Sequence, residues 1–265
     1  MRAPTTCADS TTWTSVFASS IRTAGSNESG SEVRLIEAQM GNRMLATLTI
    51  GQAPRKNIAS VVEAAMPHGV KCVHAGLLDG LTRNEMEVRF APRGNGRKLV
   101  TRVASGATVV LDKEAVGNAL QEKIVRLEAQ GCESILLLCT GEFDGLSCKR
   151  ARLFEPDKMV PAIIGALARS EKVGVVMPLR EQIETEVAKW RILSTPALYA
   201  AASPYSDDIG ELSVAARTLR ERGAQILVLD CMGYEQRHRA RAAREAGCPV
   251  ILSNTLVAKC VAEML

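Results

Sequence analysis

The feature that most constrains the fold of this chain is a strand-and-turn segment that occurs twice. The first copy, residues 134–143, reads SILLLCTGEF, and the second, residues 225–234, reads QILVLDCMGY. Aligning Cys139 with Cys231 also aligns a glycine eight residues before each cysteine and another two residues after it. An apolar run that stops at a glycine is typical of a buried parallel strand ending in a tight turn. The chain therefore contains one α/β module twice.

The segments around the two copies extend this pattern to the whole chain. Strand-like runs alternate with helical stretches of about 10 to 15 residues, which indicates parallel sheets with helices on both faces. Two β-rich runs, 98–103 and 107–111, interrupt the alternation and predict an inserted hairpin. We expect a first α/β domain at residues 44–169, completed by about 249–265, and a second at 170–248.

The N-terminal segment, residues 1–43, differs from the rest in composition. It is rich in Ser and Thr and contains the run GSNESGS at residues 25–31, which is linker composition. We expect either a disordered tail or a non-native extension, with Met40 or Met44 as the working start of translation.

The composition excludes several classes of function. With 265 residues, of which 46% are hydrophobic, the chain can bury a substantial core. The net charge of +4 comes from scattered basic residues, so no nucleic-acid partner is expected. No apolar run approaches the roughly 18 residues that span a bilayer, so no membrane role is expected. The eight cysteines lack disulfide-scaffold spacing and no signal peptide precedes them, which predicts free thiols in the cytoplasm.

The two repeated cysteines are the first candidates for chemistry. Open α/β sheets bind ligands beyond the carboxyl ends of their strands, and both thiols are expected there. A cysteine at such a place also serves as a small buried hydrophobe, without any chemical role. Both interpretations stay open on the repeat alone. The spacing of the cysteines and histidines predicts no metal site.

Further short motifs are spread over nearly the whole of residues 44–265. They are LTIGQAPR at 48–55, LFEP at 153–156, KW at 189–190, LDCMGY at 229–234 followed by QRHR at 236–239, and LSN at 252–254. With these motifs the chain resembles the AroM family, within the aspartate/glutamate/hydantoin racemase superfamily. The resemblance implies two pseudo-symmetric Rossmann-like domains that face a central cleft. It also implies a small carboxylic acid as ligand, no metal or pyridoxal cofactor, and a homodimer.

The chemistry implied by the resemblance uses Cys139 and Cys231 as a catalytic pair. One thiolate removes the proton next to the carboxylate, and the opposite thiol returns a proton to the other face. We expect each cysteine to sit where a strand meets a helix N-terminus, because free N–H groups there stabilise a thiolate and a carboxylate.

The expected substrate-binding residues follow the ends of the strands. They are Thr49, Gly51, Gln52 and Arg55 in the first loop, Thr140 and Gly141 after the first cysteine, Met232, Gly233 and Tyr234 after the second, and Ser253 and Asn254 at the last strand. Arg55 fits either a bidentate carboxylate clamp or a solvent-facing first-turn arginine. Ser253 and Asn254 fit either a substrate-binding helix cap or a plain one.

The expected function is a cofactor-independent racemase or isomerase that transfers a proton next to the carboxylate of a small carboxylic acid. The sequence CMG at 231–233 places an apolar Met232 where amino-acid racemases of the superfamily carry a hydroxyl residue. Two alternatives therefore stay open. One is a decarboxylase or lyase that uses a single cysteine, and the other is a non-catalytic metabolite-binding protein of the same fold.

Overall fold

The structure, a computed structural model, describes residues 43–94 and 96–265. The prediction of a tail at residues 1–43 therefore lies outside the described residues, apart from residue 43. The strands are β1 Met44–Thr49, β2 Lys71–Gly76, β3 Lys98–Arg102, β4 Thr108–Asp112, β5 Ser134–Leu137, β6 Arg152–Phe154, β7 Val173–Met177, β8 Leu198–Ala201, β9 Ile226–Leu229 and β10 Val250–Leu252. The helices are α2 Lys56–Ala65, α3 Arg83–Phe90, α4 Lys113–Ala129, α5 Pro156–Ala168, α6 Gln182–Thr185, the 3-10 helix η1 Ala188–Ile192, α7 Gly210–Glu221, α8 Gln236–Ala246 and α9 Ser253–Ala262.

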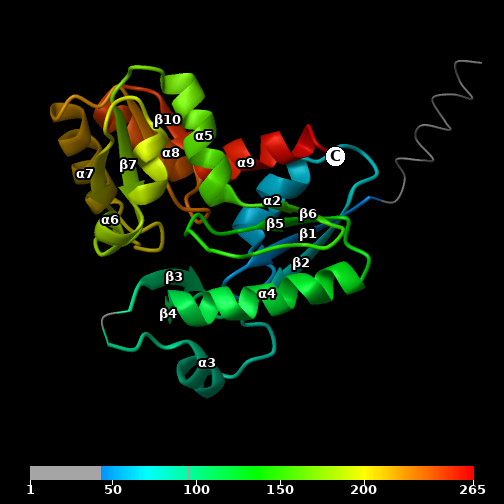
Figure 1. Ribbon diagram of the computed structural model, residues 1–265. Coiled ribbons are helices and arrows are strands. Elements are labelled where there is room, and N and C mark those ends of the chain that lie inside the picture. The colour runs from blue at the N-terminus through cyan, green and yellow to red at the C-terminus, as the bar shows by residue number, and fades with distance from the viewer. Residues whose placement is uncertain (1–42, 95) are drawn as a thin grey trace, which may run out of the picture. The chain divides into compact units, whose positions relative to one another are not determined.

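Two four-stranded parallel sheets form the framework (Figure 1). The first has the order β2-β1-β5-β6, and the second, read from its β8 edge, has the order β8-β7-β9-β10. In each half the order along the sheet is thus second, first, third and fourth strand of that half, with β3 and β4 set aside as a separate antiparallel hairpin. The duplicated segment predicted from the sequence is therefore one strand position, β5 and β9, in two copies of the same sheet.

The glycine eight residues before each repeated cysteine is required by the backbone conformation at that position. Gly131 follows α4 and Gly223 follows α7, and their φ angles are 87° and 96°. Only glycine adopts positive φ without a steric penalty, so both positions let the chain leave a helix and turn directly into a central strand. At the other end of α4, Asp112 caps the helix, because its carboxylate accepts the amide N–H of Ala115 at 2.9 Å.

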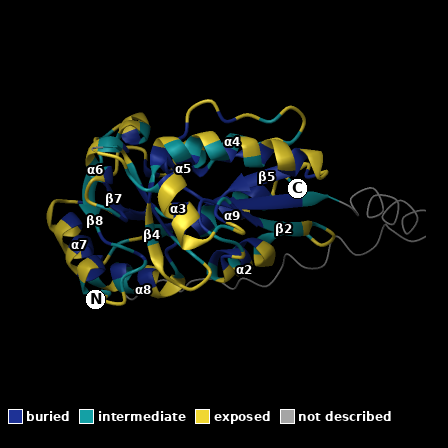
Figure 2. Cartoon of the chain, turned by 90° about the horizontal axis from the view of Figure 1, so that it is seen from below, coloured by how far each residue is buried: buried dark blue, intermediate teal, exposed yellow. Residues whose placement is uncertain are grey.

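Side chains alternate between the two faces of the central strands. In β9, Leu227 and Leu229 pack with α7, whereas Ile226 and Val228 join a core cluster that also contains residues of β1, β5, α5 and α9. This shared cluster connects the two halves, and Figure 2 shows the buried strands between helices whose outer faces are exposed. None of the helices in the described part of the chain has both the length and the apolar character needed to cross a membrane.

The last residues of the chain divide between the halves. Residues 249–265 were expected to complete the first domain. Helix α9 does contact α2 of the first half, but β10 pairs with β9 in the second sheet. The strand Val250–Leu252 therefore belongs to the second sheet, because its ladder of hydrogen bonds is with β9. The boundaries 44–169 and 170–248 stay a prediction.

The hairpin β3–β4 packs closely on the loop that follows β1. A Cβ atom at Gly51 would lie 2.3 Å from the carbonyl oxygen of Arg102. We therefore expect Gly51→Ala to lower the free energy of unfolding by about 1 to 3 kcal/mol, because a backbone atom would have to move.

Gly117→Ala is the matched control for this substitution in urea-unfolding measurements. Gly117 lies within α4, and a Cβ atom there makes an ordinary 3.5 Å contact with Phe143. We expect this change to raise stability by about 0.5 to 1 kcal/mol, because alanine is the better helix former. Equal effects of the two changes would contradict the close contact at Gly51.

Candidate active site

The two repeated cysteines have the same local geometry. Cys139 follows β5 and Cys231 follows β9, and each Sγ atom accepts the amide N–H of the glycine two residues later at 3.4 Å. These donors are Gly141 and Gly233, the glycines that follow the two cysteines at the same distance in both copies of the repeat. Each turn thus presents a thiol together with a backbone donor that favours its anionic form.

The expectation that both cysteines lie at helix N-termini was wrong. No helix lies between β5 and β6, and α8 begins at Gln236, five residues after Cys231. In the first half the carboxylate of Glu128 instead accepts the amide N–H groups of residues 149–151, so this segment leads directly into β6 without forming a helical turn. Each thiol therefore has a single amide donor in place of a helix dipole.

Both cysteines line one small cavity between the halves. It is also lined by Ile50, Arg55, Leu99, Val100, Thr101, Leu138, Thr140, Gly141, Pro178, Gln182, Tyr205 and Met232. The volume is about 30 Å³, enough for roughly one water molecule. Burial raises the pKa of both thiols, that of Cys139 to about 12. In this form the cavity is too small for a molecule larger than water, so a larger ligand has to displace some of its lining.

Arg55 points into this cavity and is buried, with 8% of its surface exposed. Its Nη1 donates to the hydroxyl of Thr101 at 3.2 Å, and its Nη2 donates to the hydroxyl of Tyr205 at 3.4 Å. No carboxylate forms a salt bridge with Arg55 among the described residues. The burial of Arg55 thus excludes the solvent-facing alternative. The guanidinium of Arg55 is held by neutral groups that an anion can replace.

A buried ion pair joins the two cysteine-bearing turns. Lys189 and Asp230 are almost fully buried, and their Nζ and Oδ2 atoms lie 2.8 Å apart. Lys189 also donates to the carbonyl oxygen of Thr140, whose hydroxyl donates to the carbonyl oxygen of Asp230 at 3.1 Å. Burial opposes the charge on Lys189, but Asp230 outweighs it and keeps the pKa of Lys189 raised. The turns after β5 and β9 are therefore fixed to each other next to the cavity.

A second buried pair lies close by. Lys113, the first residue of α4, is paired with Glu186 of the second half, and both side chains are almost fully buried. The other oxygen of Glu186 accepts the amide N–H of Glu142 at 3.0 Å. The segment after Cys139 is thus bound to the second half by charged groups at two points.

The structure places four of the predicted substrate-binding residues on the cavity. These are Arg55, Thr140, Gly141 and Met232. Three others lie behind the first loop and hold it. The hydroxyl of Thr49 accepts the amide N–H of Gly51 at 3.2 Å, and the side chain of Gln52 bonds the carbonyl of Leu78 and the amide of Ala104.

The remaining predicted residues support the second cysteine loop from behind. The hydroxyl of Ser253 donates to the carbonyl oxygen of Leu229 at 3.0 Å. The amide of Asn254 donates to the carbonyl oxygens of Met232 and Tyr234, at 3.0 and 2.6 Å. Neither residue caps its helix with its side chain.

Tyr234 and Gly233 also lie outside the cavity lining. Tyr234 is fully buried, and its hydroxyl donates to the carbonyl oxygen of Ala202 at 2.5 Å. Gly233 packs against Tyr205, with 2.6 Å between the position of its missing Cβ and the phenolic oxygen. The absence of a side chain at Gly233 is thus what allows Tyr205 to reach Cys231.

Tyr205 and the hairpin residues Leu99, Val100 and Thr101 line the cavity but were not predicted as site residues. Tyr205 follows the edge strand β8 at the same end of the sheet as Cys231, so the strand-end rule could have found it. The hairpin gave no such signal, because its strands belong to neither main sheet and reach the cavity through tertiary packing alone.

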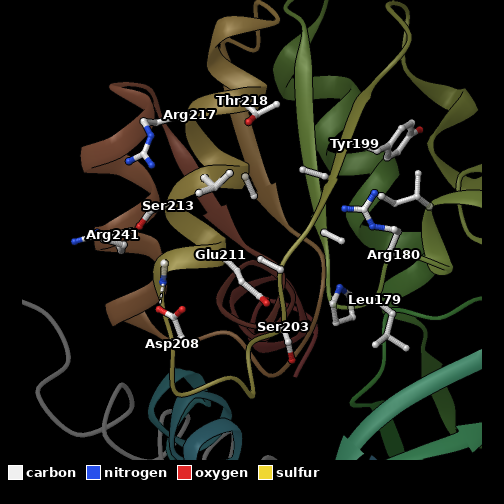
Figure 3. Close-up of a pocket in the computed structure, with 18 residues that line it drawn as sticks. Leu179, Arg180, Tyr199, Ser203, Asp208, Glu211, Ser213, Arg217, Thr218 and Arg241 are labelled. Carbon is white, nitrogen blue, oxygen red and sulfur yellow. Dashed lines mark hydrogen bonds between the residues drawn. The ribbon is translucent and has the colours of Figure 1, made fainter.

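A wider cavity of about 1040 Å³ lies elsewhere, between β8 and α7 (Figure 3). It is open and is lined by polar side chains such as Arg180, Glu211 and Arg241, and neither repeated cysteine contributes to it. We place the candidate active site at the small cavity, because that is where both thiols and the buried arginine meet.

Comparisons with known proteins agree with the internal repeat. The family model described as AroM protein matches residues 45–265, which is most of the chain. A comparison with curated proteins finds no match.

Several solved structures share the fold. Glutamate racemase isoform RacE1 from Bacillus anthracis matches with a TM-score of 0.58 at 12% identity, covering 85% of this chain and 82% of that one. Maleate isomerase Iso from Pseudomonas putida S16 matches with 0.53 at 11% identity, covering 84% and 93%. Aspartate racemase from Picrophilus torridus matches with 0.51 at 13% identity, covering 84% and 94%. At such identities the likeness concerns the fold, and it confirms the predicted pair of α/β halves.

Proposed function

The chain belongs to the AroM protein family, and from its two equivalent cysteines we propose that it is a cofactor-independent enzyme of the racemase or isomerase type. It transfers a proton next to the carboxylate of a small carboxylic acid. The observation that carries this proposal is that Cys139 and Cys231, at corresponding strand ends of the two halves, line one cavity with a buried arginine. In the proposed reaction, each thiol acts on one face of the bound molecule.

The lining of the cavity supports carbon-acid chemistry. Removing a proton next to a carboxylate leaves an enediolate, whose negative charge has to be stabilised before the opposite thiol returns a proton. Arg55 supplies a positive charge, and the buried surroundings strengthen its attraction for the developing anion. The apolar lining from Leu99, Val100 and Met232 excludes water from the reacting carbon.

The similar structures support a proposal of this kind. These proteins are a glutamate racemase, an aspartate racemase and a maleate isomerase. All three act on small carboxylic acids. In this chain the second cysteine loop carries the apolar Met232, which offers no hydroxyl group to a substrate at this position.

The proposal is tested by proton NMR in deuterium oxide. The purified protein is incubated with a panel of chiral and prochiral small carboxylic acids, and loss of the α-proton signal is followed. We expect exchange for at least one class of acid, and none with the Cys139→Ser/Cys231→Ser double variant. A ligand that binds without any exchange, over a broad panel, would contradict catalysis and favour the metabolite-binding alternative.

Arg55 offers a test of carboxylate binding. Arg55→Lys keeps the charge but loses the bidentate hydrogen-bonding geometry of the guanidinium. We therefore expect kcat/KM to fall by about 10- to 100-fold, which corresponds to the loss of one charged hydrogen bond. The control is Arg83→Lys, at an arginine whose side chain is 92% exposed in its salt bridge with Glu87. Unchanged kinetics in the Arg55 variant would remove this residue from the binding site.

A further inference from the structure

Tyr205 links Arg55 to Cys231 in a directed chain of hydrogen bonds. Arg55 has only donors, so its Nη2, at 3.4 Å, donates to the phenolic oxygen of Tyr205. The phenolic proton is then free to point at the Sγ atom of Cys231, which lies 3.9 Å from the oxygen. This arrangement favours a sulfur atom that accepts, and a thiolate accepts far better than a thiol.

The ring of Tyr205 is held firmly in this position. The guanidinium carbons of Arg55 and Arg102 lie 5.4 and 5.3 Å from its centroid. Arg102 also donates from Nη2 to the carbonyl oxygen of Tyr205 at 3.0 Å. Neither arginine forms a salt bridge with a carboxylate in the described part of the chain, so their positive charges remain available to an anion nearby.

Within residues 43–94 and 96–265, Cys139 has no comparable partners. Its Sγ atom accepts the amide N–H of Gly141, but its charged neighbours are Glu186 and Lys189, of opposite sign. The groups that face Cys231 come from several elements: Tyr205 after β8, Arg55 before α2, Asp230 and Tyr234 on either side in its own loop, and Cys139 after β5. Burial acts against ionisation of both thiols. Tyr205 and Arg55 act for ionisation at Cys231, where Asp230 acts against it. At Cys139 the charge of Lys189 acts for ionisation and that of Glu186 against it, and no hydroxyl among the described residues donates to the sulfur.

We propose that Cys231 is the thiol that ionises first and supplies the thiolate of the reacting enzyme, that Cys139 stays protonated, and that Tyr205 is the positioning residue that stabilises this arrangement. The inference rests on the proposed function for its role in catalysis. In the forward step the Cys231 thiolate takes the proton from the substrate carbon and becomes a thiol. Cys139 gives its proton to the other face of that carbon and becomes a thiolate. The reverse step, or proton exchange with water, restores the starting form.

The test follows the ionisation of each thiol without requiring turnover. Protein labelled with ¹³Cβ-cysteine is titrated by NMR, and the two signals are assigned by their loss in Cys139→Ser and Cys231→Ser. We expect the Cys231 signal to titrate at lower pH than that of Cys139. In Tyr205→Phe, which keeps the ring, we expect the thiolate-to-thiol ratio of Cys231 to fall about three- to tenfold at a given pH, with Cys139 unchanged.

Tyr199→Phe is the matched control. Tyr199 lies on β8 and lines the wider cavity, so its loss of a hydroxyl should leave both titrations unchanged (Figure 3). The inference is overturned if Tyr205→Phe leaves the titration of Cys231 unchanged, or if Cys139 ionises first. Because no substrate is present, a preserved titration order without any α-proton exchange would count against the proposed function alone.

Discussion

Serine in place of Cys139 will lower the rate of α-proton exchange by about 100- to 10,000-fold, and serine in place of Cys231 by a comparable factor. Each thiol is proposed to serve as acid or base on one face of the substrate, and removal of one such group typically costs this much. A hydroxyl keeps the shape but is far too weak an acid to replace the thiol. The measurement is the initial rate of signal loss in deuterium oxide, at equal protein concentration, for each single variant.

Cys248→Ser is the control for a change of thiol away from the cavity. Cys248 is a partly buried free cysteine that packs with the α7–α8 layer of the second half, and it does not line the small cavity. We expect its exchange rate to equal that of the wild type. Loss of activity in only one of Cys139→Ser and Cys231→Ser would support the alternative of a decarboxylase or lyase that uses a single cysteine. Such a reaction delivers a proton to one face alone.

Methionine in place of Lys189 will lower the free energy of unfolding by about 3 to 5 kcal/mol. The side chains of Lys189 and Asp230 are only 5% and 2% exposed, so the substitution leaves a carboxylate buried without its counter-charge. Asp230 also accepts a hydrogen bond from the indole of Trp190 at 3.3 Å, which does not neutralise it. Urea unfolding of the variant and the wild type measures the difference.

Two further variants make this prediction specific. The double variant Lys189→Met/Asp230→Asn also removes the carboxylate charge that Lys189→Met leaves unpaired. We therefore expect it to recover part of the stability lost by Lys189→Met. Arg83→Met breaks the exposed pair with Glu87 and should change stability by less than about 1 kcal/mol. A loss as small as this in Lys189→Met would show that the buried pair does not hold the two cysteine loops together.

The framework of the fold was predictable because local patterns of apolar residues and turns in the sequence determine most of its strands and helices. The apolar runs before Cys139 and Cys231 became β5 and β9, and the inserted hairpin appeared at 98–102 and 108–112. The pairing of Val250–Leu252 with the second sheet was not predictable in the same way. The hydrophobic pattern of a three-residue strand is too short to predict which strand it pairs with. The packing of α8 and α9 on either side of it decides which sheet it joins.

The candidate site was predictable to the extent that it depends on the ends of parallel strands. The cysteines, Arg55 and Met232 reach the cavity in this way. Ser253 and Asn254 sit at a strand end too, but they bind the backbone of the neighbouring loop. Sequence position alone does not distinguish a side chain that faces a ligand from one that supports a loop, because both lie at the same edge. Tyr205 enters the site because Gly233 leaves room for it, and that is a contact between distant segments.

The most direct test of the two-cysteine mechanism starts from one enantiomer of a chiral acid that shows exchange. The reaction is run in deuterium oxide to low conversion, and deuterium is measured separately in the product enantiomer and in the recovered starting enantiomer. Two thiols on opposite faces predict deuterium at the α-carbon of the product and almost none in the recovered starting acid, because the abstracting thiol returns the same proton. Deuterium in the recovered acid without formation of the other enantiomer would contradict the mechanism, because a single cysteine would then be removing and returning the proton on one face.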